Sequence, residues 1–447
     1  GRHGRHGHGD VRPLRVIDVD DAVDRPGVLA AVGQRGEPLH QIPRGQVDPQ
    51  DPQHGQAHRD VLAVVPPQQG GLRVAEERPF RPVPYQAGLV GVHEDVPGHT
   101  VDGGPAPAQG QQPLGVGGAD LGHVAFDYQA EWKSHVLATA IGRIGGRDLQ
   151  GHFAEQGLSP RVAALPGDAE TSGWATRTRI EFVVGEDGRP AMYRDSSHEL
   201  IGVASFPLAV EEIGELDLFG GWRSWWRPGE RVKALAPSGS DPALFIGGDS
   251  WWAPGMRADE VVREDVVAGG ELYAYQVHAG GFWQVHRAAA ASLIELVMRG
   301  ANVQPGDRVV ELYSGAGLLT QPLAVATGEA GAVYAMEASR EAVGDARANL
   351  RDLPWAHIRA GRIDARALEG VNGDVVVADP PRAGLGTELA AMLGEAKVGR
   401  IVLVSCDPAS MARDVAVMRG CGRKATFFEA VDIFPNTHHF ECVTVVE

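Results

Sequence analysis

The feature that most constrains the fold of this 447-residue chain is a regular alternation of apolar runs and helical segments from position 284 to the C-terminus. Helices are predicted at 284–299, 317–327, 340–352, 386–396 and 409–419. Strands are predicted at 308–314, 332–339, 357–364, 374–381 and 400–406. Such alternation predicts an open, mostly parallel α/β sheet with helices on both faces. The last two strands, 424–434 and 439–447, have no helix between them and predict an antiparallel edge hairpin.

The first 118 residues have a different composition, with no Lys, Ser, Asn, Cys, Met or Trp. They are crowded with Gly, Pro, Gln, Arg and His, and the prolines interrupt nearly every candidate element. One interpretation is a disordered, low-complexity arm. The other is an out-of-frame reading of a GC-rich gene, and the missing residue types favour it.

The part between these two regions, residues 119–283, is interpreted as a β-rich middle domain. A helix is predicted at 124–139, followed by a hairpin at 177–194 that turns at Glu186-Asp187-Gly188-Arg189. A DG turn between alternating segments is a strong hairpin signal.

Composition narrows the classes of function. No run of about 18 apolar residues is present, so no membrane span is expected. Three cysteines without paired spacing predict a reducing, cytoplasmic setting without disulfides, and no Cys/His set has zinc spacing. The formal charge of −17 disfavours non-specific binding to nucleic acid, so an RNA partner would need a local basic patch. We expect a monomer.

Polar residues follow successive strands of the predicted sheet, where such folds bind ligands. Gly315 and Gly317 let the backbone approach a ligand closely. The segment does not match the glycine patterns that bind dinucleotides or nucleoside triphosphates. Glu337 is suited to ribose hydroxyls and Asp364 to an adenine amino group, and Asp379 opens a Asp-Pro-Pro-Arg sequence. This order resembles a class I S-adenosylmethionine methyltransferase.

Cys406 ends a strand and precedes a helix, which predicts a lowered thiol pKa. A thiolate can add to C6 of a pyrimidine and so activate C5 for methylation, after which a base must remove the C5 proton. If the last two strands pair, Glu441 returns to the same end of the sheet as a candidate base. The alternatives are a buried, inert cysteine and a surface carboxylate.

Residues from about 120 to 447 resemble the RNA uracil-5 methyltransferase family, which makes 5-methyluridine in tRNA and ribosomal RNA. The matching motifs are FWQVH (282–286), ELYSGAG (311–317), DPPRAG (379–384), VSCDPASMARD (404–414) and FPNTHHFECV (434–443). The resemblance implies that Cys406 is the nucleophile and Glu441 the proton acceptor. It places Gln284, Tyr313, Glu337, Asp364 and Asp379 at positions that contact the cofactor or the base.

The chain also departs from this family. An N-terminal β-barrel that binds RNA is usual there, and residues 1–118 do not show one. Many members carry a four-cysteine iron–sulfur site, but here Ala119 replaces the usual cysteine and none precedes Cys406. No iron–sulfur cluster is therefore expected. Leu318 stands where some members carry a polar contact to the cofactor.

The target base must be flipped out of the RNA stack to reach such a site. Arg177, Arg179 and Arg382 are the candidate RNA contacts, whereas the tryptophans of WRSWWR (222–227) are expected mostly in the core of the middle domain. Two alternatives stay open. An exocyclic-amino methyltransferase of nucleic acid would leave Cys406 and Glu441 without a role, and an RNA-binding protein would have lost catalysis.

Overall fold

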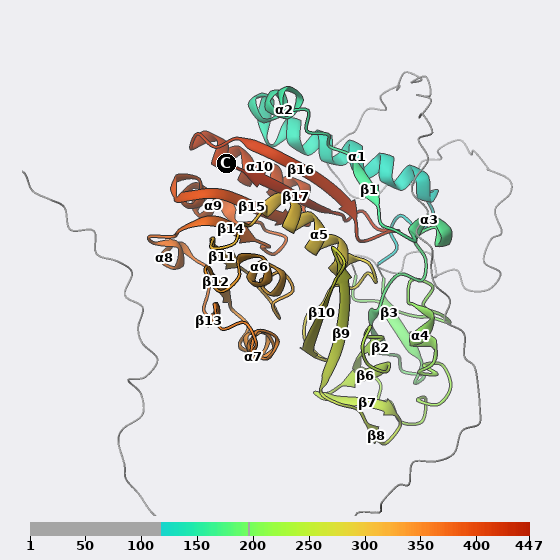
Figure 1. Ribbon diagram of the computed structural model, residues 1–447. Helices are drawn as coiled ribbons and strands as arrows, with labels where there is room; N and C mark the ends of the chain where they lie inside the picture. The colour runs from blue at the N-terminus through green and yellow to red at the C-terminus, as the bar shows by residue number, and fades with distance from the viewer. Residues whose placement is uncertain (1–117, 195–196) are drawn as a thin grey trace, which may run out of the picture. The chain divides into compact units, whose positions relative to one another are not determined.

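The computed structural model describes residues 118–194 and 197–447 (Figure 1). The interpretation of residues 1–118 as disordered or out of frame falls, apart from Gly118, outside the described residues. Within the described ranges, no helix has both the length and the apolar character needed to cross a bilayer.

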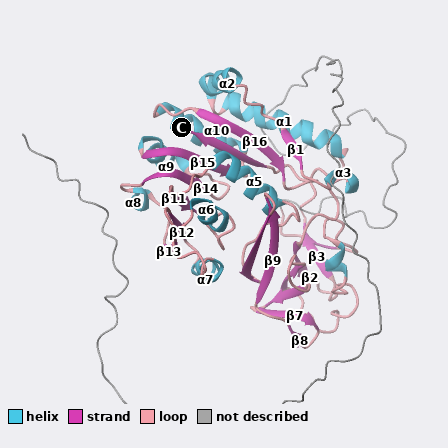
Figure 2. Ribbon diagram, in the orientation of Figure 1, coloured by secondary structure: helices cyan, strands magenta, loops and turns pink. Residues whose placement is uncertain are grey.

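The C-terminal region forms an eight-stranded sheet in the order β1-β16-β17-β15-β14-β11-β12-β13. Its parallel centre consists of β11 (Arg308–Leu312), β12 (Ala332–Glu337), β13 (Ala356–Ala360), β14 (Asn372–Ala378) and β15 (Lys397–Ser405). Figure 2 shows helices on both faces of this sheet. One face carries α5 (Ala289–Ala301), α6 (Thr320–Thr327) and α7 (Arg340–Asn349). On the other lie α8 (Ala365–Leu368), α9 (Gly386–Glu395) and α10 (Pro408–Gly420).

Each face of the sheet has its own hydrophobic core because successive side chains of a strand point to opposite sides. Val375 and Val377 pack with α5 and α6, whereas Val376 packs in the core beneath α9 and α10. By the same alternation, Val402 packs in the core on the α5–α6 face and Leu403 packs in the core on the α9–α10 face. Continuous burial of these strands explains why they read as uninterrupted apolar runs in the sequence.

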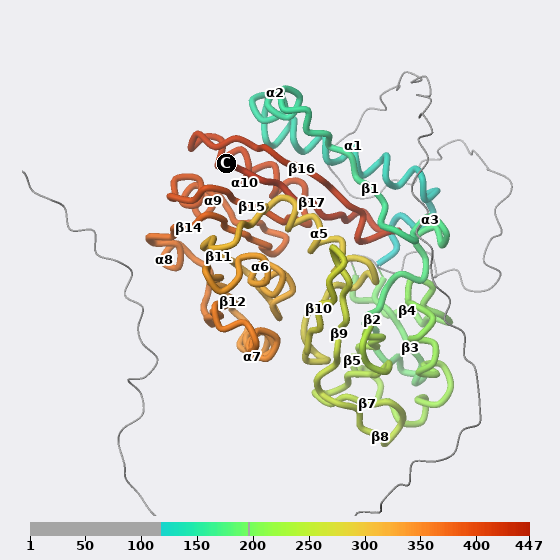
Figure 3. The backbone as a smooth tube through the Cα atoms, viewed as in Figure 1, coloured from blue at the N-terminus to red at the C-terminus, as the bar shows by residue number. Residues whose placement is uncertain are grey.

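The last two strands pair antiparallel as predicted, but they do not form the edge of the sheet. β17 (Glu441–Val446) is inserted between β15 and β16 (Ala425–Asp432), as Figure 3 shows along the backbone. The edge is β1 (Val162–Ala164), which pairs parallel with β16. The sequence did not indicate this strand because its three residues are too short for a periodic pattern.

The helical part of residues 119–283 also differs from the predicted β-rich domain. α1 (Phe126–Arg143) and α2 (Gly146–Glu155) pack on the C-terminal sheet, with Leu137, Leu149 and Phe153 in the core of its α9–α10 face. Burial against this sheet, rather than local pattern, decides where the two helices belong.

The rest of the middle region is β-rich, as predicted. A seven-stranded sheet has the order β4-β3-β2-β5-β6-β7-β8, and the predicted hairpin is formed by β2 (Arg179–Val184) and β3 (Pro190–Tyr193). Its other strands are β4 (Leu200–Gly202), β5 (Arg231–Leu235), β6 (Ala243–Ile246), β7 (Asp249–Ala253) and β8 (Met256–Arg257). Two short helices, α3 (Asp168–Thr171) and α4 (Glu211–Gly214), flank it, and β9 (Val261–Ala268) pairs with β10 (Glu271–His278). Trp222 and Trp226 fill the core of this region.

Two glycine substitutions test the packing of α5 on β17. At Gly300 of α5, an added Cβ would lie 2.9 Å from Cγ2 of Val445, whereas at Gly344 of α7 it would meet nothing within 4 Å. Alanine favours a helix over glycine by about 1 kcal/mol, but overpacking costs roughly 1–3 kcal/mol. We expect Gly344→Ala to raise the free energy of unfolding and Gly300→Ala to lower it, measured by urea denaturation. Equal stabilisation by both would contradict the close approach.

Candidate active site

The turn after β11 is shaped to bring the backbone close to a ligand. Tyr313, Gly315 and Gly317 take φ values of 64°, 54° and 93°, in the left-handed region that favours glycine. Tyr313 is the only one of the three with a side chain, and its N–H donates to the carbonyl oxygen of Met336 at 2.9 Å. The turn is therefore held against the end of β12 in a conformation that opens its backbone toward the strand ends.

Glu337 ends β12 and braces this turn. One carboxylate oxygen accepts from the N–H of Gly315 at 3.0 Å and the other from the N–H of Ser339 at 2.7 Å. Asp364 lies beyond the end of β13, where its exposed side chain caps α8 by accepting from Ala367 N–H at 3.0 Å. Glu337 therefore ends its strand as predicted, whereas β13 ends at Ala360 and not at Asp364. The contacts of the two acids with ribose and adenine stay predictions.

Cys406 and Glu441 face each other across β15 and β17. The antiparallel register pairs Ser405 with Cys442, so the next residues outward are Cys406 and Glu441. Opposite residues of such a pair point to the same side of the sheet, and Cys442 points to the other side. Asp379 follows β14, the neighbour of β15, and its N–H donates to Leu312 at 3.3 Å. Cys406, Glu441 and Asp379 therefore lie at the same end of the sheet.

The electrostatics of this edge differ from the prediction for Cys406. Burial, helped by the charges of Glu441 and Asp379, raises the pKa of the Cys406 thiol to about 11. The expected lowering is wrong, because burial outweighs the effect of Arg382 and of the backbone N–H that lower the thiol pKa. Asp407 caps α10, accepting from Ser410 N–H at 2.7 Å. The positive charge of Arg382 opposes the rise without overcoming it.

Three buried carboxyl groups interact electrostatically at this end of the sheet, because Asp379 acts on both Glu311 and Glu441. Burial raises the pKa of Asp379 to about 7 and, with the charge of Asp379, holds the pKa of Glu441 well above its usual range. Glu311 was not singled out from the sequence, although an acid inside the apolar run RVVEL was a usable signal. It is 2% exposed, and burial raises its pKa to about 8. Three carboxyl groups that are hard to ionise favour a cationic ligand.

The FWQVH segment is extended rather than helical, since α5 begins at Ala289 and not at the predicted Gln284. It pairs with the start of the β2 region, where Thr178 N–H donates to Val285 at 2.8 Å. Gln284 is 9% exposed and lines a cavity of about 550 Å³ together with Trp283. Its contact with the cofactor stays a prediction.

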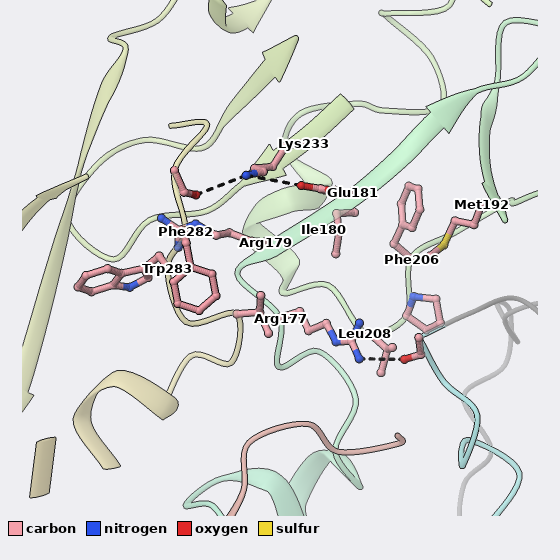
Figure 4. A pocket seen from close by; sticks show the side chains of 14 residues that line it. Arg177, Arg179, Ile180, Glu181, Met192, Phe206, Leu208, Lys233, Phe282 and Trp283 are labelled. Carbon is pink, nitrogen blue, oxygen red and sulfur yellow. Dashed lines mark hydrogen bonds and ion pairs between the residues drawn. The ribbon is translucent and has the colours of Figure 1, made fainter. Parts of the chain in front are cut away.

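A second cavity, of about 410 Å³, lies beside this segment and contains two of the predicted RNA contacts (Figure 4). Arg177 donates to the carbonyl oxygen of Gly118 at 2.8 Å. Arg179 differs from the prediction: it is 6% exposed, and its guanidinium pairs with Glu264 at 2.6 Å. Phe282 was not singled out, yet its ring is 75% exposed. Arg382, next to the Asp-Pro-Pro turn, is exposed.

Comparisons with known proteins indicate a family for this chain. The family model described as tRNA (uracil-5-)-methyltransferase matches residues 357–447. An uncharacterized RNA methyltransferase of Bifidobacterium longum is 34% identical over 351 residues, covering 74% of this chain and 78% of the relative. Another, from Lactococcus lactis, is 37% identical over 385 residues, covering 74% and 81%.

A solved structure shares the fold. The tRNA (uracil-54, C5)-methyltransferase of Pyrococcus abyssi, crystallised with S-adenosyl-L-homocysteine, aligns with a TM-score of 0.54 and 20% identity, covering 75% of this chain and 86% of that one. The α/β fold class predicted from the sequence, a doubly wound sheet that follows a β-rich region, is confirmed.

The raised pKa of Cys406 predicts how its thiol reacts. Because the charge of Glu441 disfavours the thiolate, Glu441→Gln should lower the thiol pKa and speed alkylation by iodoacetamide at pH 9. The rate is measured against pH in a Cys421→Ala background, since Cys421 is half-buried and Cys442 is fully buried. Glu429→Gln on β16, whose carboxylate pairs with Arg299 instead, is the matched control. An unchanged pH profile in Glu441→Gln would show that the charge of Glu441 does not raise the thiol pKa.

Proposed function

Because the chain belongs to the RNA methyltransferase family that the tRNA (uracil-5-)-methyltransferase model describes, we propose that it transfers a methyl group to C5 of a uridine in tRNA or ribosomal RNA. S-adenosylmethionine is the methyl donor. The observation that carries the proposal is the register of β15 and β17, which sets Cys406 opposite Glu441. An exocyclic-amino methyltransferase would need neither residue.

The residues at the strand ends fit this methyl donor. S-adenosylmethionine, when bound, supplies an electrophilic methyl group on a positively charged sulfonium. The carboxyl groups of Glu311 and Asp379, with pKa values raised to about 8 and about 7, become easier to ionise beside a cation. Glu337 keeps lone pairs for ribose hydroxyls while it braces Gly315. Tyr313 and Gly317 complete the turn that would border the ligand.

Cys406 activates the uracil ring. Its thiolate adds to C6, the S–C6 bond forms, and electron density moves to C5. C5 takes the methyl group, whose bond to the sulfonium breaks, and neutral S-adenosylhomocysteine is the leaving group. The positive charges of Arg382 and of the bound donor favour the thiolate against the burial that raises its pKa. C5 then carries both the methyl group and its original proton.

Glu441 removes that proton. The C5–C6 double bond re-forms, the S–C6 bond breaks, and Cys406 leaves as a thiolate. The pKa of Glu441 is raised by burial, which strengthens it as a base once it is ionised. One of its oxygens, Oε1, is buried and has no hydrogen-bond partner among the described residues. An acceptor oxygen without a partner is available for a proton from the substrate.

The cavity beside FWQVH is the proposed RNA contact, together with Arg382. The exposed ring of Phe282 offers a stacking surface, and Arg177 supplies a positive charge beside it (Figure 4). Arg179 contributes indirectly, because its ion pair with Glu264 ties β2 to β9 beneath the cavity. A local cationic and aromatic patch is what an acidic chain needs to bind RNA.

Cys406→Ala tests the covalent mechanism. It should reduce methyl transfer by at least roughly 10⁴-fold, because no other group would activate C5. It should also abolish the covalent adduct with 5-fluorouridine RNA, while calorimetry shows unchanged binding of S-adenosylhomocysteine. Cys421→Ala, which removes a cysteine at the end of α10, should behave as wild type. An active Cys406→Ala enzyme would refute the mechanism and leave the amino-methyltransferase alternative.

Glu441→Gln tests the base. The carboxamide cannot accept the C5 proton, so release should fail after methyl transfer has occurred. A protein–RNA complex that resists denaturing gels and carries label from the donor's methyl group should accumulate. Glu429→Gln should turn over normally. If the Glu441→Gln adduct carries no methyl label, or turnover is normal, Asp379 becomes the candidate base.

A further inference from the structure

The loop of residues 433–440 connects β16 to β17 and determines where Glu441 lies, because Glu441 is the first residue of β17. Asn436, in the middle of this loop, is 2% exposed and takes a φ of 64°. A residue with a side chain holds such a conformation only where its surroundings stabilise it. The contacts of Asn436 therefore bear on the position of the carboxylate five residues later.

Two of those contacts come from α1, in addition to hydrogen bonds with the backbone of Leu121 and Ser172. Gln129 donates from Nε2 to Oδ1 of Asn436 at 3.0 Å, and its Oε1 accepts from the backbone N–H of Asn436 at 2.9 Å. The amide of Gln129 also donates to the carbonyl oxygen of Val124 at 3.0 Å, and the side chain is 1% exposed. This reciprocal pair joins residues that are 307 positions apart in the sequence.

Lys133, one helical turn further along α1, fixes the start of the loop. Its Nζ lies 2.6 Å from Oδ2 of Asp432 and 3.2 Å from the carbonyl oxygen of Phe434. The side chains of Lys133 and Asp432 are 0% and 2% exposed. A well-packed apolar pair often stabilises a fold as well as a buried ion pair does. Two polar contacts at successive turns of one helix, both to this loop, therefore indicate a role in geometry.

We propose that Gln129 and Lys133 are positioning residues that hold the loop of residues 433–440 and thereby keep the Glu441 carboxylate opposite Cys406. This inference rests on the proposed role of Glu441 as acceptor of the C5 proton. Cys406 follows β15 and is not part of this loop. Cys406 and Glu441 are therefore positioned by different parts of the fold. Loss of the contacts from Gln129 or Lys133 to the loop should slow the release of the adduct more than its formation.

Ser134, the next residue after Lys133, provides a matched control. Its hydroxyl accepts from the backbone N–H of Val162 at 2.9 Å and thus anchors β1 instead of the loop. Ser134→Ala therefore removes two partly buried hydrogen bonds, this one and the bond that its hydroxyl donates to Ala130, without changing the contacts of Asn436. A purely structural role for Gln129 would make Gln129→Met resemble Ser134→Ala.

The experiment follows single turnovers of full-length enzyme with unmodified tRNA and ribosomal RNA transcripts and methyl-labelled donor. Gln129→Met keeps the size of the side chain and removes both hydrogen bonds to Asn436. A misplacement of about 1 Å in a reacting group can cost up to 10²-fold in rate, so we expect release to slow by at least about tenfold. Methylated adduct should accumulate, while the KM for the donor stays within about twofold of wild type and Ser134→Ala releases normally.

Asn436→Gly is the second variant and is used even if Gln129→Met does not fold. Glycine accepts the left-handed conformation, so the variant loses the side-chain half of the pair with Gln129 and the 3.4 Å hydrogen bond from Asn436 Nδ2 to the carbonyl oxygen of Ser172. Normal release in the folded variants, or equal slowing of formation and release, would overturn the positioning role. A wild-type enzyme that forms no adduct with 5-fluorouridine RNA would refute the proposed function itself, and the positioning role with it.

Discussion

The antiparallel pairing of β17 with β15 is the constraint on which the rest of the site depends. All other neighbours in the centre of the sheet are parallel, so their carboxyl ends share one edge. Because β17 runs the opposite way, its first residue, Glu441, lies at that edge and not at the far one. A thiol at the end of one strand and a carboxylate at the start of another can then face the same two neighbouring atoms of a substrate.

The burial of acidic side chains is the second physical constraint on the site. Glu311, Asp379 and Glu441 all have raised pKa values because their charged forms lose water without gaining a cation. The same burial raises the pKa of Cys406. A cationic methyl donor would favour the charged form of each group, whereas the negative charges of Glu441 and Asp379 oppose ionisation of the thiol. In the proposed mechanism, the positive charge of the donor would therefore act on the Cys406 thiol through electrostatics.

Much of the fold could be predicted from the sequence, and the failures have identifiable causes. The strands of the parallel centre were located to within a few residues because buried strands give long apolar runs. The start of α5 was missed because FWQVH continues the apolar pattern of the helix, although it pairs with the segment before β2. β1 was missed because strand membership there depends on a pairing partner more than 260 residues away. The partner of Arg179 was missed because Glu264 is distant in sequence.

The sequence by itself determined the α/β alternation, the order of acids at the strand ends and the identity of Cys406 and Glu441 as candidate catalytic residues. These depend on local periodicity and on which side chains can perform the chemistry. Only the tertiary structure decided the insertion of β17, the raised thiol pKa and the attachment of α1 to the loop before Glu441. Register, burial and long-range pairing set these properties, and each arises from residues that meet only when the chain has folded.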